Sequence, residues 1–179
     1  MYYKEMTTAV GHFNDNLKKF VSSLESIIGQ DDIDLRTFTE YIDLIHINIR
    51  ILIVPFQKYV ANDVRYVHNI LRENKDFFVN YDFLNDDKQM AKKKHIGLER
   101  KERVIFKLKG MISKVPDDQM KMIFDNMKVL IYFSLLDQYK DSANSTGLVE
   151  SYLALCNSNE NMEVTNKGMP SDETKNATN

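Results

Sequence analysis

The chain has 179 residues, 43% of them hydrophobic and 28% charged, and a formal net charge of -2. This balance is typical of a globular protein, and the length suits one domain followed by a polar tail rather than two domains. Six Gly and three Pro are few for a many-stranded sheet, and the single cysteine, Cys156, excludes an intramolecular disulfide and a multi-cysteine metal site. We therefore expect an all-α helical bundle of about five long helices and a short sixth, with a single domain over residues 1–156 and a disordered tail over 157–179.

The N-terminal region carries charges such as Lys4 and Asp15 and lacks the continuous apolar stretch of a signal peptide. The most apolar window, 42–56, is interrupted by Asp43 and Arg50 and is shorter than a membrane span. We therefore expect an intracellular protein that is not secreted and has no transmembrane helix.

The clearest pattern lies at the N-terminus, where apolar residues alternate at spacings of three and four. This heptad-like pattern predicts a long helix from Tyr3 to Ile28 with one narrow apolar seam, and Gly29 stands where a left-handed C-cap would end it. Another helix must cover the seam, either in the same chain or in a second copy, so we interpret it as an interaction seam. The seam consists of Tyr3, Met6, Val10, Phe13, Leu17, Phe20, Leu24 and Ile27.

A second helix is predicted to begin near Leu35 with Asp34 as its N-cap, because a carboxylate there can accept free amide hydrogens at the positive end of the helix dipole. Apolar residues keep helical spacing as far as Leu52. Residues 45–51 also alternate strictly between apolar and polar, as a half-buried strand would. We favour a helix because the flanks keep the period of 3.6 and a lone strand would have no partner.

His46 lies on the polar side of this predicted helix, between Asp43 and Arg50. Residues at positions i, i+3 and i+7 share a helix face, so the three side chains could form a polar functional triad. The alternative is an ordinary solvated or ion-paired stripe, which we favour.

Pro55 is predicted to kink or split the helix, because it has no amide hydrogen and crowds the preceding turn. An apolar stripe then continues to about Asn74, and an aromatic cluster leads into a turn at 85–87. A fourth helix, basic in its first half, is expected to end at Pro116 with Leu108, Ile112 and Val115 inward, and Gly97 and Gly110 weaken it.

The fifth predicted helix runs from about Asp118 to Tyr139, with Asp117 or Asp118 as its cap, and it is apolar on nearly every side around residues 129–136. We therefore place it at the centre of the core. A loop over 141–147 precedes a short last helix, 148–156, in which Tyr152 and Leu153 are predicted to face inward.

Positive charge is concentrated in residues 88–114, which hold ten Lys or Arg against two Glu, a net charge of +8. Such a segment could bind phosphates of nucleic acid or anionic lipid through counterion release, or it could complement acidic regions of the same protein or of a partner. The candidate anion-binding residues are Lys88, Lys92, Lys93, Lys94, Arg100, Lys101, Arg103 and Lys107.

Catalytic and metal-binding patterns are missing from the sequence. The four histidines, at positions 12, 46, 68 and 95, show no metal-ligand spacing, and the chain has neither a Gly-rich phosphate loop nor a Gly-x-Ser-x-Gly elbow. We therefore predict no cofactor, no metal and no enzymatic activity. The leading interpretation is a structural or protein–protein interaction protein, assembling with other chains or with itself, such as a component of a viral particle.

Two alternatives remain open. One is a helical protein that binds nucleic acid or an anionic surface through segment 88–109. The other follows from the arrangement of helices around one apolar central helix, which is similar at the level of the fold to Bcl-2-like viral modulators. That resemblance would imply a groove for a partner helix. The family's Asn-Trp-Gly-Arg motif is absent, and the chain has no Trp.

Overall fold

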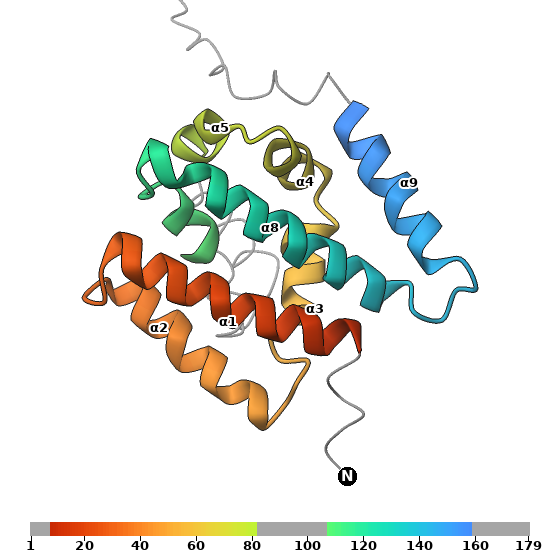
Figure 1. Ribbon diagram of the computed structural model, residues 1–179, viewed down its shortest axis with the longest axis horizontal. Coiled ribbons are helices and arrows are strands. Elements are labelled where there is room, and N and C mark those ends of the chain that lie inside the picture. The colour runs from red at the N-terminus through yellow and green to blue at the C-terminus, as the bar shows by residue number, and fades with distance from the viewer. Residues whose placement is uncertain (1–7, 82–106, 159–179) are drawn as a thin grey trace, which may run out of the picture.

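The computed structural model describes residues 8–81 and 107–158, and the elements in this part of the chain are helices, without a strand. Figure 1 shows α8 (Asp117–Gln138) across the middle of the molecule, with α1 (Ala9–Ile28) alongside it and α9 (Ser145–Ser158) at one end. The buried apolar side chains of these helices form one continuous cluster. The predicted all-α architecture is therefore confirmed.

Helix α1 begins later than the heptad pattern predicted. Thr8 has an extended backbone, with φ -90° and ψ 152°, and its hydroxyl accepts a hydrogen bond from the Gly11 amide at 3.2 Å. Because Thr8 is the N-cap, the prediction that one continuous helix starts at Tyr3 is wrong: α1 starts at Ala9. The predicted seam residues Tyr3 and Met6 lie outside the described residues. The helix ends before Gly29, as predicted. Gly29 itself has a φ of +97°, but its ψ of 149° lies outside the left-handed helical region that was predicted for the C-cap.

Helix α2 (Ile33–Ile42) is capped by Asp32, and the prediction of Asp34 as the cap is wrong. One carboxylate oxygen of Asp32 accepts hydrogen bonds from the amides of Asp34 and Leu35, each at 3.0 Å. Both aspartates had suitable chemistry, and the short turn after Gly29 places the earlier one at the open end of the helix.

The chain between α2 and residue 61 is the largest departure from the predicted elements. A 3-10 turn, η2 (Asp43–His46), is followed by turns to residue 52, then by α3 (Ile53–Phe56) and the π-helical η3 (Gln57–Ala61). Residues 47–51 are thus neither the predicted helix nor the alternative strand. Pro55 lies in the first turn of α3, where it interrupts no helical hydrogen bond. The predicted kink or split at Pro55 is therefore wrong: the break in the predicted helix lies before α3, and helical structure continues through Pro55 into η3.

Burial explains why this segment turns. Ile47 is 72% exposed, whereas Leu52 and Ile53 are fully buried. The carbonyl of Ile49 accepts a hydrogen bond from Nδ2 of the buried Asn14 at 2.8 Å. These contacts with α1 and the core favour a turned backbone over either regular pattern.

Helix α4 (Val64–Leu71) begins at an Asp63 cap, whose carboxylate accepts the Arg65 amide at 3.0 Å, so the predicted apolar stripe to Asn74 is interrupted there. Helix α5 (Lys75–Asn80) follows and completes an aromatic cluster around the buried Tyr66. The other rings of this cluster are those of Phe77, Phe78 and Tyr81. The predicted turn at 85–87 lies outside the described residues.

The end of the predicted fourth helix is described as a helical segment over 107–112, and Leu108, Ile112 and Val115 are buried, as predicted. Pro116 occupies the N-cap position of α8 without a side-chain cap bond, so the predicted aspartate cap is wrong, and Asp117 lies in the first turn instead. The central position of α8 is confirmed by its fully buried residues, Ile123, Leu130, Ile131 and Leu135.

Helix α9 starts at Ser145, three residues before its predicted start. The residues that it buries fully are Val149 and Cys156, whereas Tyr152 and Leu153 are half-buried against the core. Residues 159–179, which include most of the predicted tail, lie outside the described part of the chain.

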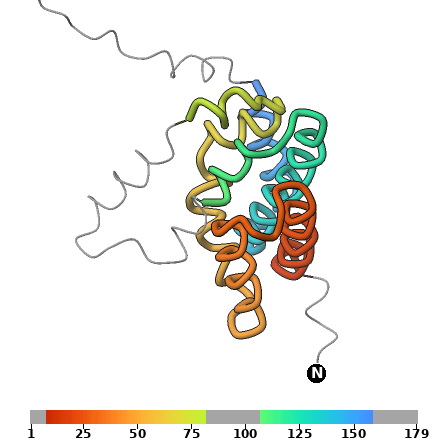
Figure 2. Tube along the Cα trace, turned by 90° about the vertical axis from the view of Figure 1, so that its left-hand side faces the viewer, coloured from red at the N-terminus to blue at the C-terminus, as the bar shows by residue number. Residues whose placement is uncertain are grey.

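Figure 2, viewed along the molecule, shows α1 and α8 side by side. They run in opposite directions in Figure 1. Within the described residues, the helices are either too short or too polar to span a bilayer.

Candidate functional site

The N-terminal seam is covered within the chain. Val10, Phe13, Leu17, Phe20 and Leu24 are buried to 6% exposure or less in the cluster shared with α8, and Ile27 is half-buried. Of the two arrangements that the heptad pattern allowed, the structure has the intramolecular one. The described seam residues are therefore core residues, and a partner cannot reach them in this structure.

A different apolar surface on α8 is left partly exposed by the described residues. Its side chains recur at helical spacing on the side opposite the fully buried positions; Met122 and Val129 project outward, whereas Tyr132, Phe133 and Leu136 also pack against the edge of the core. Val129 is 38% exposed and Met122 is 41% exposed, and the remaining three are half-buried. We call this surface the outer face of α8; it consists of Met122, Val129, Tyr132, Phe133 and Leu136.

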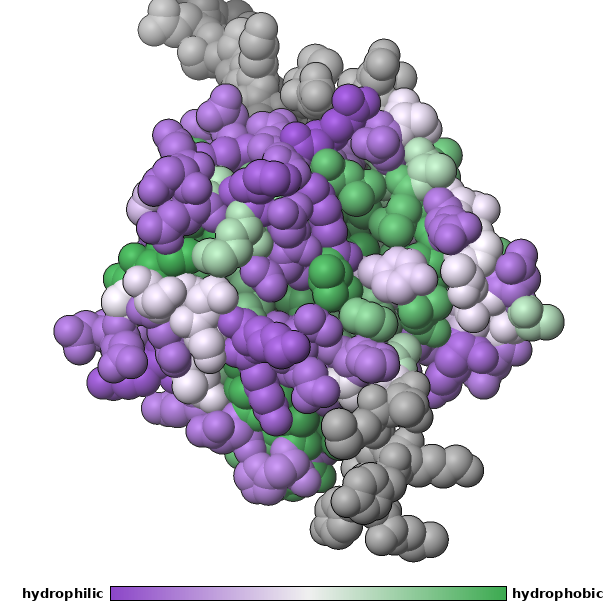
Figure 3. All heavy atoms as spheres, viewed as in Figure 1, coloured by the Kyte–Doolittle hydropathy of each residue, from purple (hydrophilic) through white to green (hydrophobic). Residues whose placement is uncertain are grey.

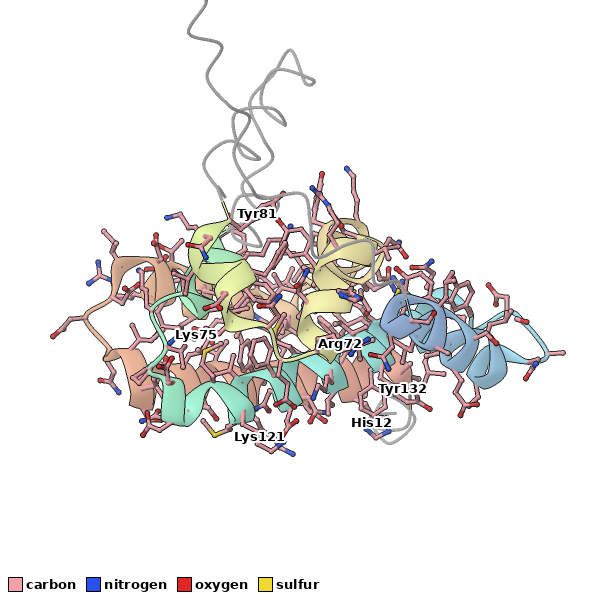
Figure 4. The ribbon with its side chains drawn as sticks, turned by 90° about the horizontal axis from the view of Figure 1, so that it is seen from above. His12, Arg72, Lys75, Tyr81, Lys121 and Tyr132 are labelled. Atoms are coloured by element: carbon pink, nitrogen blue, oxygen red, sulfur yellow. The ribbon has the colours of Figure 1, made fainter. Side chains whose placement is uncertain are left out.

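Figure 3 shows apolar side chains gathered on the molecular face that lies over α8 and the space toward α9. His12 of α1 borders this surface, with its ring stacked on Phe133 at 5.0 Å between centroids and 25° between planes. Figure 4 shows His12, Tyr132 and Lys121 on the same side of the molecule. The outer face is therefore continuous with the exposed side of α1.

The N-terminal half of the outer face is a shallow groove of about 510 Å³. Met122 and Val129 supply its apolar surface, and Asn126 adds an amide. Its charged border consists of Asp118, Lys121 and Asp125. Lys121 lies 3.5 Å from the Asp125 carboxylate, one turn away, and is itself 74% exposed. This combination of apolar floor and charged rim is typical of a protein contact surface.

The principal buried polar cluster in the described residues surrounds Asp137 of α8. Both terminal nitrogens of Arg50 donate to its carboxylate, at 2.8 and 2.6 Å, and Gln57 donates to it at 2.9 Å and to the Ser134 carbonyl at 2.7 Å. Burial alone would raise the pKa of Asp137, which is 4% exposed, but the hydrogen bonds from Arg50 and Gln57 lower it below its ordinary value. The cluster fastens segment 47–57 to α8.

This cluster replaces the predicted triad around His46. Because both terminal nitrogens of Arg50 bind Asp137, Arg50 does not complete a triad with His46 and Asp43. His46 is exposed, in agreement with the favoured interpretation of a solvated or ion-paired stripe. The sequence did not predict Asp137 as the partner of Arg50, because these two residues lie 87 positions apart.

The basic segment makes intramolecular contacts where it is described. Lys107 lies 2.8 Å from Asp34, and Lys114 lies 2.7 Å from Asp32. Lys109 is 2% exposed, with its ammonium 3.5 Å from the centroid of the Tyr66 ring. This end of the segment therefore complements the protein's own acidic turn. The other candidate anion-binding residues, Lys88, Lys92, Lys93, Lys94, Arg100, Lys101 and Arg103, lie outside the described part.

A second buried polar group joins α9 to α4 and to η3. Nδ1 of His68 donates to the Cys156 carbonyl at 2.7 Å, since a carbonyl can only accept, and the Tyr152 hydroxyl donates to the Ala61 carbonyl at 2.9 Å. Burial raises the pKa of the Cys156 thiol, and a hydrogen bond with Tyr152 lowers it only in part. The His68 ring contacts the cysteine backbone, so these residues hold α9 in place and do not form an activated thiolate.

Metal-ion ligands do not converge among the described residues: no group of three or more His, Cys, Asp or Glu side chains could hold an ion there. Comparisons with known proteins found no matching family, no matching curated protein and no matching solved structure. The geometry of the chain itself is therefore the basis for a functional proposal.

Proposed function

We propose that this protein is a helical interaction protein whose contact surface is the outer face of α8. The observation that supports the proposal is the composition of the second half of α8, which is apolar on nearly all sides around residues 129–136. Its inner side is buried by α1 and neighbouring helices, whereas residues 8–81 and 107–158 leave Val129 and Met122 exposed. A helix that is apolar all round is normally covered all round, so its exposed side is a candidate contact with another chain.

The proposal differs from the sequence interpretation in its contact residues. The N-terminal seam is part of the core, so the intermolecular role passes to a surface on the helix that covers the seam. An assembly role suits a surface of this kind, because interfaces are rich in Met and aromatic residues such as Tyr132 and Phe133.

A comparative pull-down tests the proposal. The tagged full-length protein is expressed in its native host alongside a variant with Met122→Lys and Val129→Lys, and bound proteins are quantified. Both positions are more than a third exposed, so the variant should keep its helical circular dichroism. The matched control is Ile33→Lys, which changes a residue of α2 that is 67% exposed. We expect a stoichiometric protein, either a second kind of chain or this chain itself, to be lost from the α8 variant and kept by the control.

Equal recovery of all bound proteins by the variant and the wild type would contradict the proposal.

The alternative of nucleic-acid binding through residues 88–109 predicts a different result. Retention on DNA or RNA would fall steeply with salt and would weaken when Lys92, Lys93 and Lys94 are replaced by Ala.

A further inference from the structure

The C-terminal end of α9 is attached to α4 by two side chains. Nδ1 of His68 donates to the Cys156 carbonyl at 2.7 Å, and the Arg72 guanidinium donates to the Asn157 carbonyl at 3.1 Å. Both carbonyls belong to the last turn of α9, where the helix itself supplies no donor. The two side chains therefore cap α9 and fasten it to the rest of the molecule.

His68 occupies this contact in its neutral form. The residue is 1% exposed, and its ring proton is on Nδ1, because the Cys156 carbonyl can only accept. Nε2 is then the unprotonated nitrogen; it is sealed from solvent, and no polar group of the described residues lies within hydrogen-bonding distance of it. A second proton would therefore place a charge and an unpaired N–H group in the interior.

The charged and titratable groups around this contact do not supply the missing acceptor. Arg72 lies one helical turn from His68, and its positive charge opposes a second cation beside it. The negative end of the α9 dipole favours a cation, but it contributes less than an unpaired, buried charged donor costs. The groups are Asp63, Arg65 and Arg72 from α4 and its cap, Tyr152 and Cys156 from α9, Lys58 and Tyr59 from η3, and Tyr139 at the end of α8.

We propose that His68 makes the attachment of α9 sensitive to pH, so that this helix is released as the pH falls from 7.5 to 5.5. A solvated imidazole takes up its second proton near pH 6.5, whereas the buried ring has no place for it. Acid therefore favours the state in which the ring reaches water. The proposal is independent of the outer face of α8.

Helix α9 is the element that can move at least cost. Only Val149 and Cys156 of its described residues are buried, whereas α8 buries residues along its whole length. Elements with few buried contacts open at a lower free energy than the core. Its release breaks the bond to His68 and uncovers the apolar side chains of α4 and α8 beneath it.

The size of the effect follows from proton linkage. In the released state, the ratio of charged to neutral imidazole rises from about 0.1 at pH 7.5 to about 10 at pH 5.5. The ratio of released to docked α9 should therefore rise about tenfold over this interval. The contribution of His68 to docking is fully present well above pH 6.5 and is lost as the pH falls below it.

Labelling of Cys156 measures the release, because this single cysteine is fully buried where α9 is docked. The reagent is a dipyridyl disulfide, which reacts with thiols in acid. The labelling rate of the full-length protein is divided at each pH by the rate in urea, so that the reactivity of the thiol itself cancels. We expect this quotient to be about tenfold higher at pH 5.5 than at pH 7.5.

The matched variants are His68→Asn and His46→Asn. An asparagine amide can donate to the Cys156 carbonyl in place of Nδ1 but does not titrate, so His68→Asn should change its quotient less than about twofold between the two pH values. His46 is exposed, and its replacement should leave the tenfold rise intact. A wild-type quotient that does not change with pH would overturn the proposal, and so would a full rise in His68→Asn.

Hydrogen exchange of the wild-type protein, read by mass spectrometry, tests the release without any substitution. After correction for the intrinsic rate at each pH, exchange in residues 145–158 should be about tenfold faster at pH 5.5, and exchange in α1 and α8 should change less than about twofold. Equal acceleration of all three helices would show opening of the whole molecule and would also overturn the proposal.

Discussion

Asp137 shows how a single residue can decide the position of a whole segment. Its carboxylate is buried and charged. The Arg50 guanidinium neutralises it and the Gln57 amide donates a further hydrogen bond, and both groups come from the segment 47–57 rather than from a neighbouring turn of α8. A buried charge without a partner is costly, so the stability of this region depends on all three groups being present.

Replacing Asp137 by Ala is expected to lower the free energy of unfolding by about 2 kcal/mol. The loss leaves Arg50 and Gln57 without their acceptor, and it stays below that of a fully buried pair because the Arg50 side chain is 37% exposed. Urea denaturation followed by circular dichroism measures the change. The control is Asp125→Ala on the outer surface of the same helix, where the expected change is below about 1 kcal/mol.

Cys156 is expected to be unreactive in the folded protein. Its side chain is fully buried, and burial raises the pKa of its thiol, so little thiolate is present near neutral pH. Reaction with a chromogenic disulfide reagent should therefore proceed only at the rate at which α9 opens, and it should become fast in denaturant. Immediate labelling of native protein would contradict the docked position of α9.

At the scale of elements, hydrogen bonds at helix ends and packing at helix sides act separately. The ends of α1 are set by Thr8 and Gly29, which belong to neighbouring sequence, and its side is set by α8, which lies a hundred residues later. The end of α1 at Gly29 could therefore be predicted from local sequence, whereas the helix that covers the apolar seam of α1 could be identified only from the tertiary structure.

Two glycines provide a matched test of helix-end geometry. Gly29 has a φ of +97°, whereas Gly110 lies in the helical segment 107–112, and a methyl group at either position meets no atom within 4 Å. Gly29→Ala should thus lower the free energy of unfolding by about 1 kcal/mol through backbone strain alone. Gly110→Ala should raise it by about 0.5–1 kcal/mol, because Ala has the higher helix propensity. Thermal denaturation of the two variants should show shifts of opposite sign, and shifts of the same sign would contradict this account.

At the scale of the whole molecule, acidic side chains connect distant parts of the chain. Asp32 binds Lys114, Glu73 binds Lys128, and Asp137 binds Arg50. The pKa of each of these three carboxyl groups lies below its ordinary value. The hydrogen bond from Lys114 is the main cause at Asp32, as the bond from Lys128 is at Glu73.

These lowered pKa values predict loss of stability in acid. Their contribution is fully present above the pKa of the unfolded carboxyl groups, about 4, and is lost as the pH falls through the lower folded values. The free energy of unfolding, measured by urea titration at pH 7, 5, 4 and 3, should therefore decrease below pH 4. Asp137→Asn should make this decrease shallower, and a wild-type stability that is unchanged at pH 3 would contradict the prediction.

The sequence by itself determined the fold class, the end of α1 before Gly29, and the central place of α8, because helical periodicity and apolar composition are local properties of the chain. It did not determine the turns at 47–52 or the partner of Arg50, since both depend on residues far away in sequence. It also did not determine the cap of α2, because Asp32 and Asp34 have the same chemistry and the geometry of the turn after Gly29 decides between them. Tertiary structure also decided which apolar surface is available to a partner. The heptad pattern identified a seam that needs a covering helix, but only the fold shows that α8 covers it and leaves its own outer face exposed.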